Sequence, residues 1–515
     1  MPGDGGPDAA VIRAPGDLDA ARILQVAAGQ RVEISPGLLD DVRRVCEAAR
    51  EVLRRGDPVY GVNTGMGALS GVRLTEAEQL AHQRNLLLGR ATGGPPWLEA
   101  ADARAIVAVR LRTFLSGDSG VSAGLCQHLA ATLNAGLVPA VPRTGVGSAG
   151  EILPLAHAFG PLAGIGQVLA PPTRAAGTAQ AGPTAQTGPT AQAGPTVPAG
   201  GALRESGVAA FRLGPREGHA LLAGVPGATA LSLRRLAEAR TLASAMEQAA
   251  ALSIAAAGAS RDPYRASCAR GDDILAGVLA RLRAAVGDLP EPRSLQAPVS
   301  FRVVGPVLTQ VLRAADALAA AVERALTGVT DSPAFLDGAF TGTAGFHGID
   351  LAAHCDLLTA ALAHAAEVSA ARLHRLLDPR VTGLPAQLAA RPGPDAGLVA
   401  VHKRAAGEVH ALRRLAAPAS TGLIETSGGQ EDVQSFAWEA AENLRGARHT
   451  AQAVTACELL AAYQASALSD RPAPPGCRET LSWLAGIVGP ITADRPFGED
   501  IERIRRLLPT LPAPV

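Results

Sequence analysis

Apolar side chains recur at helical spacing along most of the chain. Leu39, Val42 and Cys46 would share one face of a helix, with charged residues between them, which is the spacing of an amphipathic helix. Residues 307–326 and 351–377 continue the pattern with alanine and leucine, and small side chains let helix axes approach closely. The pattern therefore predicts a mainly α protein built on a long helical bundle.

The length of the chain predicts more than one lobe, because 515 residues exceed what one hydrophobic core usually serves. We expect an N-terminal lobe over 17–204, a central helical bundle over 205–470, and a helical C-terminal tail over 471–515 after a Pro/Gly break. Residues 1–16 are rich in Gly, Pro and Asp, and we expect this terminus to be disordered.

A low-complexity segment interrupts the N-terminal lobe at residues 171–201. It contains the consecutive hexapeptides TAQAGP, TAQTGP and TAQAGP over residues 178–195. Without large apolar side chains it cannot bury enough surface to offset its ordering entropy. We interpret it as a disordered surface insertion; a binding motif is the alternative.

Composition excludes several classes of partner. Lys plus Arg and Asp plus Glu both number 47, so no basic excess indicates nucleic acid. The six cysteines form neither a CxxC pair nor a Cys/His cluster, so we expect reduced thiols and no metal site. The first residues lack the features of a signal peptide, and residues 152–170 contain too many helix breakers for a membrane span. We therefore expect a cytoplasmic protein without a membrane partner.

The first specific motif is the glycine-rich string YGVNTGMG at residues 60–67, which holds Tyr60 and Asn63. It resembles the YGVNTGFG loop of histidine and phenylalanine ammonia-lyases, in which the tyrosine is a catalytic acid/base group. Further segments that resemble the aromatic amino acid ammonia-lyase family follow in the family's order, namely NLLLGRATGG (85–94), RLRTFLSGDSG (110–120), LGPREGHALLAG (213–224), VTDSP (329–333), GFHG (345–348) and SGGQED (427–432). The resemblance covers about residues 20–465. It implies the helical ammonia-lyase/fumarase-like fold and a homotetramer whose active sites combine several chains.

The cofactor loop departs from the family pattern. Family enzymes cyclise an Ala-Ser-Gly tripeptide into a methylidene-imidazolone, and the serine must lose water. Here the loop reads Ser148-Ala149-Gly150, which places Ala149 at the serine position. Alanine has no leaving group, so we predict that the cofactor is absent and the loop vestigial. A shifted register would cyclise residues 147–149 instead; it requires an extra helix residue before Pro154.

Other family positions change with the loop. Ala223 replaces the asparagine that contacts the substrate amine, and Arg90 replaces the histidine of the SHAAGVG segment. Residues 292–296 resemble the PYSLR segment, so Arg293 and Gln296 replace its tyrosine and arginine. A guanidinium binds carboxylate or phosphate bidentately, and we predict that Arg90 and Arg293 bind substrate. Exposed or intersubunit ion pairs are the alternative.

The remaining site residues agree with the family. We predict that Tyr60 and Glu431 are catalytic, because a phenol and a carboxylate can exchange protons with a substrate. We predict that Asn63, Phe346 and Gln430 bind substrate. Tyr60 could instead be a packed aromatic, and Glu431 could cap a helix.

The sequence thus predicts a lyase-family enzyme without an imidazolone and without a metal. It would perform acid/base chemistry on a small carboxylate- or carbonyl-bearing substrate, by conjugate addition, elimination, isomerisation or cyclisation, and we expect it to belong to bacterial specialised metabolism. One alternative is a non-catalytic homologue acting as a binding or scaffold subunit. Another is an ammonia-lyase for histidine or an aromatic amino acid, which needs the shifted register.

Overall fold

A computed structural model describes residues 9–171, 194–287 and 291–512. The chain divides into two compact units, each built from three segments. Unit 1 comprises residues 1–234, 319–353 and 419–442; unit 2 comprises residues 235–318, 354–418 and 443–515.

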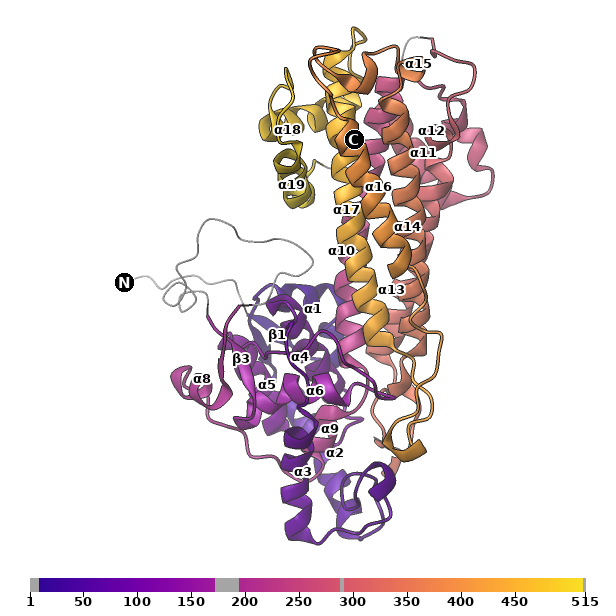
Figure 1. Ribbon diagram of the computed structural model, residues 1–515. Helices are drawn as coiled ribbons and strands as arrows, with labels where there is room; N and C mark the ends of the chain where they lie inside the picture. The colour runs from indigo at the N-terminus through magenta and orange to yellow at the C-terminus, as the bar shows by residue number, and fades with distance from the viewer. Residues whose placement is uncertain (1–8, 172–193, 288–290, 513–515) are drawn as a thin grey trace. The chain divides into compact units, whose positions relative to one another are not determined.

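Among the described residues, unit 1 contains short helices (Figure 1) and three two-stranded sheets. Helix α4 buries 13 of its 16 residues and packs against α1 and α5. The helices that lie wholly within this unit are α1 (Ala20–Ala27), α2 (Pro36–Arg54), α3 (Glu76–Arg90), α4 (Ala100–Leu115), α5 (Ala123–Asn134), α6 (Ile152–Phe159), α8 (Ala199–Glu205) and α9 (Glu217–Leu222).

The three sheets have strands of three residues each. Strands β1 (Ala10–Ile12) and β2 (Val32–Ile34) pair in parallel, with Ala10 opposite Val32. The antiparallel pairs are β3 (Gln167–Leu169) with β4 (Thr196–Pro198), and β5 (Ala334–Leu336) with β6 (Ala339–Thr341). Such short strands add little core of their own, so the helices supply most of it.

Unit 2 is a helical bundle, in which the long helices α13, α14, α16 and α17 run side by side (Figure 1). Four helices, α10, α13, α14 and α17, have residues in both units. The helices with residues in unit 2 are α10 (Pro226–Ala257), α11 (Asp273–Val286), α12 (Val299–Arg302), α13 (Val304–Thr327), α14 (Ile349–Leu376), α15 (Pro379–Thr382), α16 (Val399–Leu415), α17 (Ala437–Leu468), α18 (Arg478–Val488) and α19 (Phe497–Leu507).

Local sequence signals fix where the helices next to the site begin. Helix α2 starts after Ser35, whose side chain accepts a hydrogen bond from the Leu38 amide. Helix α3 starts after Thr75, which forms a reciprocal capping box with Glu78. Each cap satisfies amides that the first helical turn leaves unpaired, so both helices begin at defined residues.

The mainly α fold predicted from the sequence is confirmed, with three corrections. Residues 9–16 are ordered, because Ala10 and Ile12 are buried in the β1–β2 pair; residues 1–8 lie outside the described residues. The insertion ends earlier than predicted, because β4 and α8 begin at Thr196 and Ala199; residues 172–193 lie outside the described part. The units are also interleaved along the chain, since helices continue from one unit into the other.

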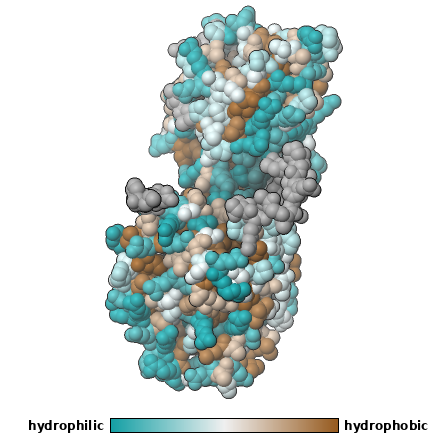
Figure 2. Space-filling view, turned by 90° about the vertical axis from the view of Figure 1, so that its left-hand side faces the viewer, coloured by the Kyte–Doolittle hydropathy of each residue, from teal (hydrophilic) through white to brown (hydrophobic). Residues whose placement is uncertain are grey.

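Polar and apolar side chains are interspersed over the visible surface (Figure 2). Within residues 9–171, 194–287 and 291–512, no helix combines the length and apolar character needed to cross a membrane. The same residues contain no group of three His, Cys, Asp or Glu side chains placed to hold a metal ion. None of the six cysteines, all of which lie within the described residues, forms a disulfide.

Candidate active site

Unit 1 contains a cavity of about 250 Å³ that gathers several of the predicted site residues. Its volume is close to the lower end for small-molecule sites. The wall combines apolar side chains with a phenol, an imidazole, an amide and a carboxylate. The lining residues are Tyr60, Met66, Ala149, Gly150, Ile152, His219, Leu222, Ala223, Gly224, Ser332, Phe346, Gln430 and Glu431.

Tyr60 lies in the loop between α2 and α3, and its phenol is 37% exposed. The phenol oxygen accepts a hydrogen bond of 2.8 Å from the Gly67 amide. This bond leaves the phenol proton available for another acceptor. An amide aimed at the oxygen also stabilises negative charge there, so the geometry suits a group that gives and takes a proton.

Asn63 shapes the Tyr60 loop and is outside the cavity lining. Its buried carboxamide accepts a hydrogen bond of 2.7 Å from the Val59 amide and donates one of 2.7 Å to the Asp57 carbonyl. These bonds close the loop on itself just before and after Tyr60. Asn63 was predicted to bind substrate. In the structure its contacts position the Tyr60 loop.

The loop at residues 148–150 forms part of the cavity wall. The Ser148 hydroxyl donates a hydrogen bond of 2.7 Å to the Gly150 carbonyl, while Ala149 and Gly150 line the cavity. The Ala149 amide donates a hydrogen bond of 3.0 Å to Glu431 Oε2. The residues present do not fit imidazolone formation in the family register, because the central residue Ala149 carries only a methyl group.

Glu431 reaches this loop from the segment before α17. Its Oε2 accepts hydrogen bonds from the Ala149 amide and from the Thr426 hydroxyl, the latter at 3.1 Å. Gln430 lies beside it in the cavity wall, and Phe346 comes from the turn Gly345–His347. The structure thus brings the predicted site residues Tyr60, Phe346, Gln430 and Glu431 together in the wall of one cavity within a single chain.

Arg90 is the last residue of α3 and is half-buried. Its Nη2 atom lies 3.9 Å from the sulfur of Met66. Burial lowers the pKa of Arg90, and the nearby Tyr60 and Glu431 oppose that shift. The guanidinium is therefore in the electrostatic reach of both predicted catalytic residues, although it is outside the cavity lining.

Arg293 and Gln296 are exposed residues of unit 2. The Arg293 amide donates a hydrogen bond of 3.0 Å to the Gly258 carbonyl. The lining of the unit 1 cavity does not include either side chain in the described part of the chain.

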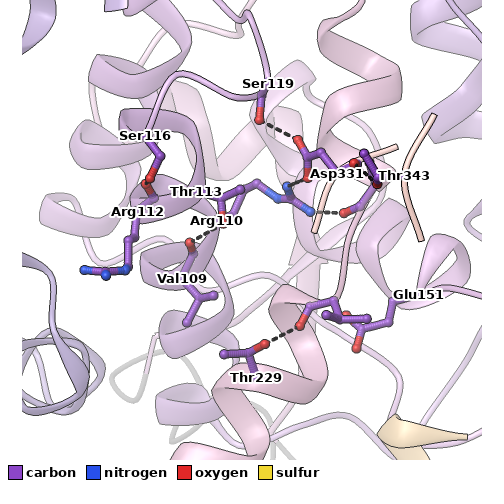
Figure 3. A network of polar contacts seen from close by, with 12 residues as sticks. Val109, Arg110, Arg112, Thr113, Ser116, Ser119, Glu151, Thr229, Asp331 and Thr343 are labelled. Carbon is purple, nitrogen blue, oxygen red and sulfur yellow. Dashed lines mark hydrogen bonds and ion pairs between the residues drawn. The ribbon is translucent and has the colours of Figure 1, made fainter. Parts of the chain in front are cut away.

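A buried polar network that includes Arg110, Ser119 and Asp331 (Figure 3) adjoins the cavity wall at Ala223 and Gly224. The fully buried Arg110 of α4 pairs with Asp331 at 2.7 Å and also donates to the Ala223 carbonyl. Gly224 has a φ of +72°, and a Cβ there would lie 2.8 Å from the Thr330 hydroxyl. The wall at Ala223, where the family pattern has asparagine, is therefore held by its backbone.

Arg216 belongs to the same network and precedes α9 in a left-handed conformation with a φ of 71°. Such a backbone costs a non-glycine residue about 1–3 kcal/mol. The side chain is fully buried, donates to the Ser119 and Pro333 carbonyls, and lies 4.7 Å from the centre of the Phe340 ring. Burial lowers the pKa of Arg216 to about 10, a shift that the carboxylate of Asp331 opposes.

Glu151 follows the 148–150 loop and is 3% exposed. Its carboxylate accepts hydrogen bonds of 2.7 and 2.6 Å from the amides of Gly227 and Ala228, in the first turn of α10. Burial raises the pKa of Glu151 to about 7, although these amides and Arg110 act in the opposite direction. The loop is therefore tied to a group that titrates near neutral pH.

Several lining residues were missed by the sequence analysis, above all His219. Met66, Ile152 and Leu222 are ordinary apolar residues that carry no signal of a site. His219 did carry one, since a histidine stands within the apolar run HALL where the family pattern LxxKEGLALING has leucine.

Comparisons with known proteins agree with this fold. The family model "Aromatic amino acid lyase" matches residues 18–485. Histidine ammonia-lyase of Symbiobacterium thermophilum is 31% identical over 492 residues, covering 93% of this chain and 92% of that protein.

Two solved structures have the same fold. Ergothionase of Treponema denticola, an ergothioneine-degrading enzyme, superposes with a TM-score of 0.87 at 22% identity, covering 97% of this chain and 99% of that one. Histidine ammonia-lyase of Trypanosoma cruzi gives a TM-score of 0.85 at 25% identity, with 97% and 93% covered. The chain therefore belongs to the aromatic amino acid lyase family and is a lyase-like enzyme.

Proposed function

We propose that this enzyme works without a methylidene-imidazolone and uses Tyr60 as its proton-transfer group. The substrate would be a small molecule bearing a carboxylate or carbonyl group. The observation that carries the proposal is the cavity itself, which sets the Tyr60 phenol and the Glu431 carboxylate around an Ala149 methyl. The cavity therefore has side chains for acid/base chemistry, whereas position 149 lacks the serine that forms the electrophile in the family pattern.

Tyr60 would exchange a proton with the substrate in either direction. Its hydroxyl proton is free to be donated while the Gly67 amide holds the oxygen. After donation, that amide and the positive charge of Arg90 would stabilise the phenolate. This balance suits conjugate addition, elimination from an already activated substrate, isomerisation or cyclisation, each of which needs proton transfer at carbon or oxygen.

Glu431 and Arg90 would have separate roles, the first in proton transfer and the second in substrate binding. Glu431 holds the Ala149 amide and would serve as the second acid/base group once substrate displaces that bond. Arg90 would bind the substrate carboxylate, because a guanidinium matches its two oxygens. Gln430 and Phe346 would contact the rest of the molecule from the cavity wall.

We further propose a homotetramer, as the family resemblance implies. Arg293 is exposed on unit 2, and in a homotetramer it could reach the cavity of another subunit. The proposed partners of this protein are then a small-molecule substrate and further copies of the same chain.

The test compares Tyr60→Phe with the wild type on a panel of α,β-unsaturated carboxylic acids with water or ammonia as the nucleophile, following loss of the unsaturated chromophore. Tyr60→Phe should lower turnover by about 10²-fold or more, because it removes a general acid/base group. Circular dichroism should show the same helical content, since Phe keeps the ring. Tyr463→Phe is the matched control, because Tyr463 belongs to unit 2 and does not line the cavity.

Full activity in Tyr60→Phe would contradict the proposal. Wild-type protein that turns over no acid would favour a non-catalytic binding subunit. Turnover of histidine would favour an ordinary ammonia-lyase.

A further inference from the structure

His219 stands in the cavity wall without a role in the proposed chemistry. It belongs to α9 and is 2% exposed. Its backbone amide donates a hydrogen bond of 2.9 Å to Gln83, whose own amide group donates to the Gly61 carbonyl at 3.3 Å. The backbone of His219 is therefore tied to the loop that carries Tyr60.

The imidazole ring packs between Tyr60 and Gly61. Its centre lies 6.0 Å from the centre of the Tyr60 ring, and the two planes are nearly perpendicular at 87°. A Cβ on Gly61 would lie 2.4 Å from His219 Cδ2 and 2.9 Å from Nε2. This edge of the ring therefore faces the Gly61 backbone, and Nδ1, at the opposite vertex, points away from it.

The Nδ1 atom of His219 is buried and has no hydrogen-bond partner among the described residues. A buried polar atom without a partner costs about 1–3 kcal/mol, so a residue chosen only for packing would not be expected here. Leucine, which the family pattern has at this position, would fill the same wall without that cost. The imidazole is thus better explained by something that the cavity binds.

The surroundings keep the imidazole neutral. Burial lowers the pKa of His219 to about 3. Arg216, and more weakly His82 and Arg90, act in the same direction, while Asp331 opposes them. A neutral imidazole offers one donor and one acceptor, and it does not balance the charge of a buried ion.

We propose that His219 is a substrate-contacting residue whose imidazole binds an uncharged hydrogen-bonding group of the substrate, such as a hydroxyl or a carbonyl. The inference rests on the proposed function, because it assigns the substrate of the same cavity. Two residues then recognise the substrate. Arg90 binds its carboxylate, and His219 binds a neutral polar group elsewhere on the molecule. A site built around such a hydrogen bond discriminates against ligands that lack the group.

The experiment uses three variants of the full chain. His219→Leu removes both ring nitrogens and restores the residue of the family pattern. His219→Asn keeps an amide group at about the position of Nδ1. His128→Leu is the matched control, since His128 also has a buried ring nitrogen without a partner in the described chain but does not line the cavity.

Binding of cinnamate and 4-hydroxycinnamate is measured by calorimetry, because the two acids differ by one uncharged hydroxyl. Wild type should bind 4-hydroxycinnamate roughly tenfold more tightly, which is about the worth of one neutral hydrogen bond. His219→Leu should abolish this preference, whereas His219→Asn and His128→Leu should keep it. A wild type without the preference, or a preference unchanged in His219→Leu, would overturn the inference.

Thermal unfolding of the same variants forms a second arm that needs no ligand. His219→Leu should unfold at the same temperature as wild type or higher, because it removes an unpaired buried nitrogen. A fall of several degrees would show a structural role and overturn the inference. If neither acid binds to wild type, the carboxylate site of the proposed function is contradicted. The unfolding temperatures alone then decide whether His219 has a structural role in packing.

Discussion

Two buried arginine–carboxylate pairs, one in each unit, differ in how fully they are hydrogen-bonded. In unit 2, Glu458 accepts hydrogen bonds from Ser253 at 2.7 Å, from Ser369 at 2.5 Å, and from Arg372 at 2.7 and 2.9 Å. Its two oxygens are fully occupied. Such a pair orders the packed helices that carry it, and it leaves no charge for a ligand.

The pair in unit 1 is less complete. Asp331 faces two buried guanidiniums, through its ion pair with Arg110 and its electrostatic interaction with Arg216. Arg110 Nε and Arg216 Nη1 have no hydrogen-bond partner among the residues that the structure describes. This cluster adjoins the cavity through Ala223.

The difference distinguishes buried polar groups that only stabilise the fold from buried polar groups that adjoin a site. A saturated pair stabilises one arrangement of helices. An unsaturated cluster, in contrast, leaves guanidinium donors without a partner in the described chain, in residues that contact the cavity wall at Ala223.

The largest effect on stability is expected for Asp331→Asn. The change removes a buried carboxylate from two guanidiniums, and breaking such a pair costs about 3–5 kcal/mol. We expect about 5 kcal/mol in the free energy of unfolding by urea, together with loss of turnover. A loss below about 1 kcal/mol would contradict a stabilising role for the buried pair of Arg110 and Asp331.

Glu458→Gln should cost somewhat less, about 4 kcal/mol, because the amide oxygen can still accept from the hydroxyls and Arg372. Turnover per folded molecule should stay at the wild-type value, since this pair belongs to the bundle of unit 2. The comparison fails if Glu458→Gln lowers turnover of correctly folded protein as strongly as Asp331→Asn does.

Stability should also depend on Glu151. Its pKa is raised from 4.5 to about 7 in the folded protein, so the folded state binds more protons between these values. The contribution is therefore complete below pH 4.5 and is lost as the pH rises through 7, by about 3 kcal/mol. Urea unfolding at pH 5 and pH 8 should show this loss in wild type and a smaller loss in Glu151→Gln; equal losses would contradict it.

The smallest effect is expected for Gly61→Ala, at about 2 kcal/mol. The residue has a φ of +67°, which is strained for alanine, and the new methyl group would meet the His219 ring. Turnover should fall because Tyr60 is the neighbouring residue. Gly71→Ala is the control, as a Cβ there meets nothing within 4 Å; similar losses in both variants would argue against a close contact at Gly61.

Much of the helical architecture was predictable from periodicity. Leu39, Val42 and Cys46 are all buried on one face of α2, as their spacing indicated. The strand Ala10–Ile12 was missed because three residues are too few for an alternating pattern. The interleaved units were missed because helices such as α13 continue from one unit into the other, and no break in sequence marks that boundary.

The site was predictable where the sequence follows the family pattern. Tyr60, Phe346, Gln430 and Glu431 line one cavity, although hundreds of residues separate the first from the last. His219 was missed because a histidine in an apolar helix resembles a core residue. Its neighbours, and the nitrogen left without a partner in the described chain, become visible only in three dimensions.

The most direct test of the central claim is the intact mass of the purified protein. The account predicts a mass equal to that of the sequence, because Ala149 has no hydroxyl to lose. A deficit of two water molecules would show that Ser148 cyclises in the shifted register, and it would contradict an enzyme that works without the imidazolone.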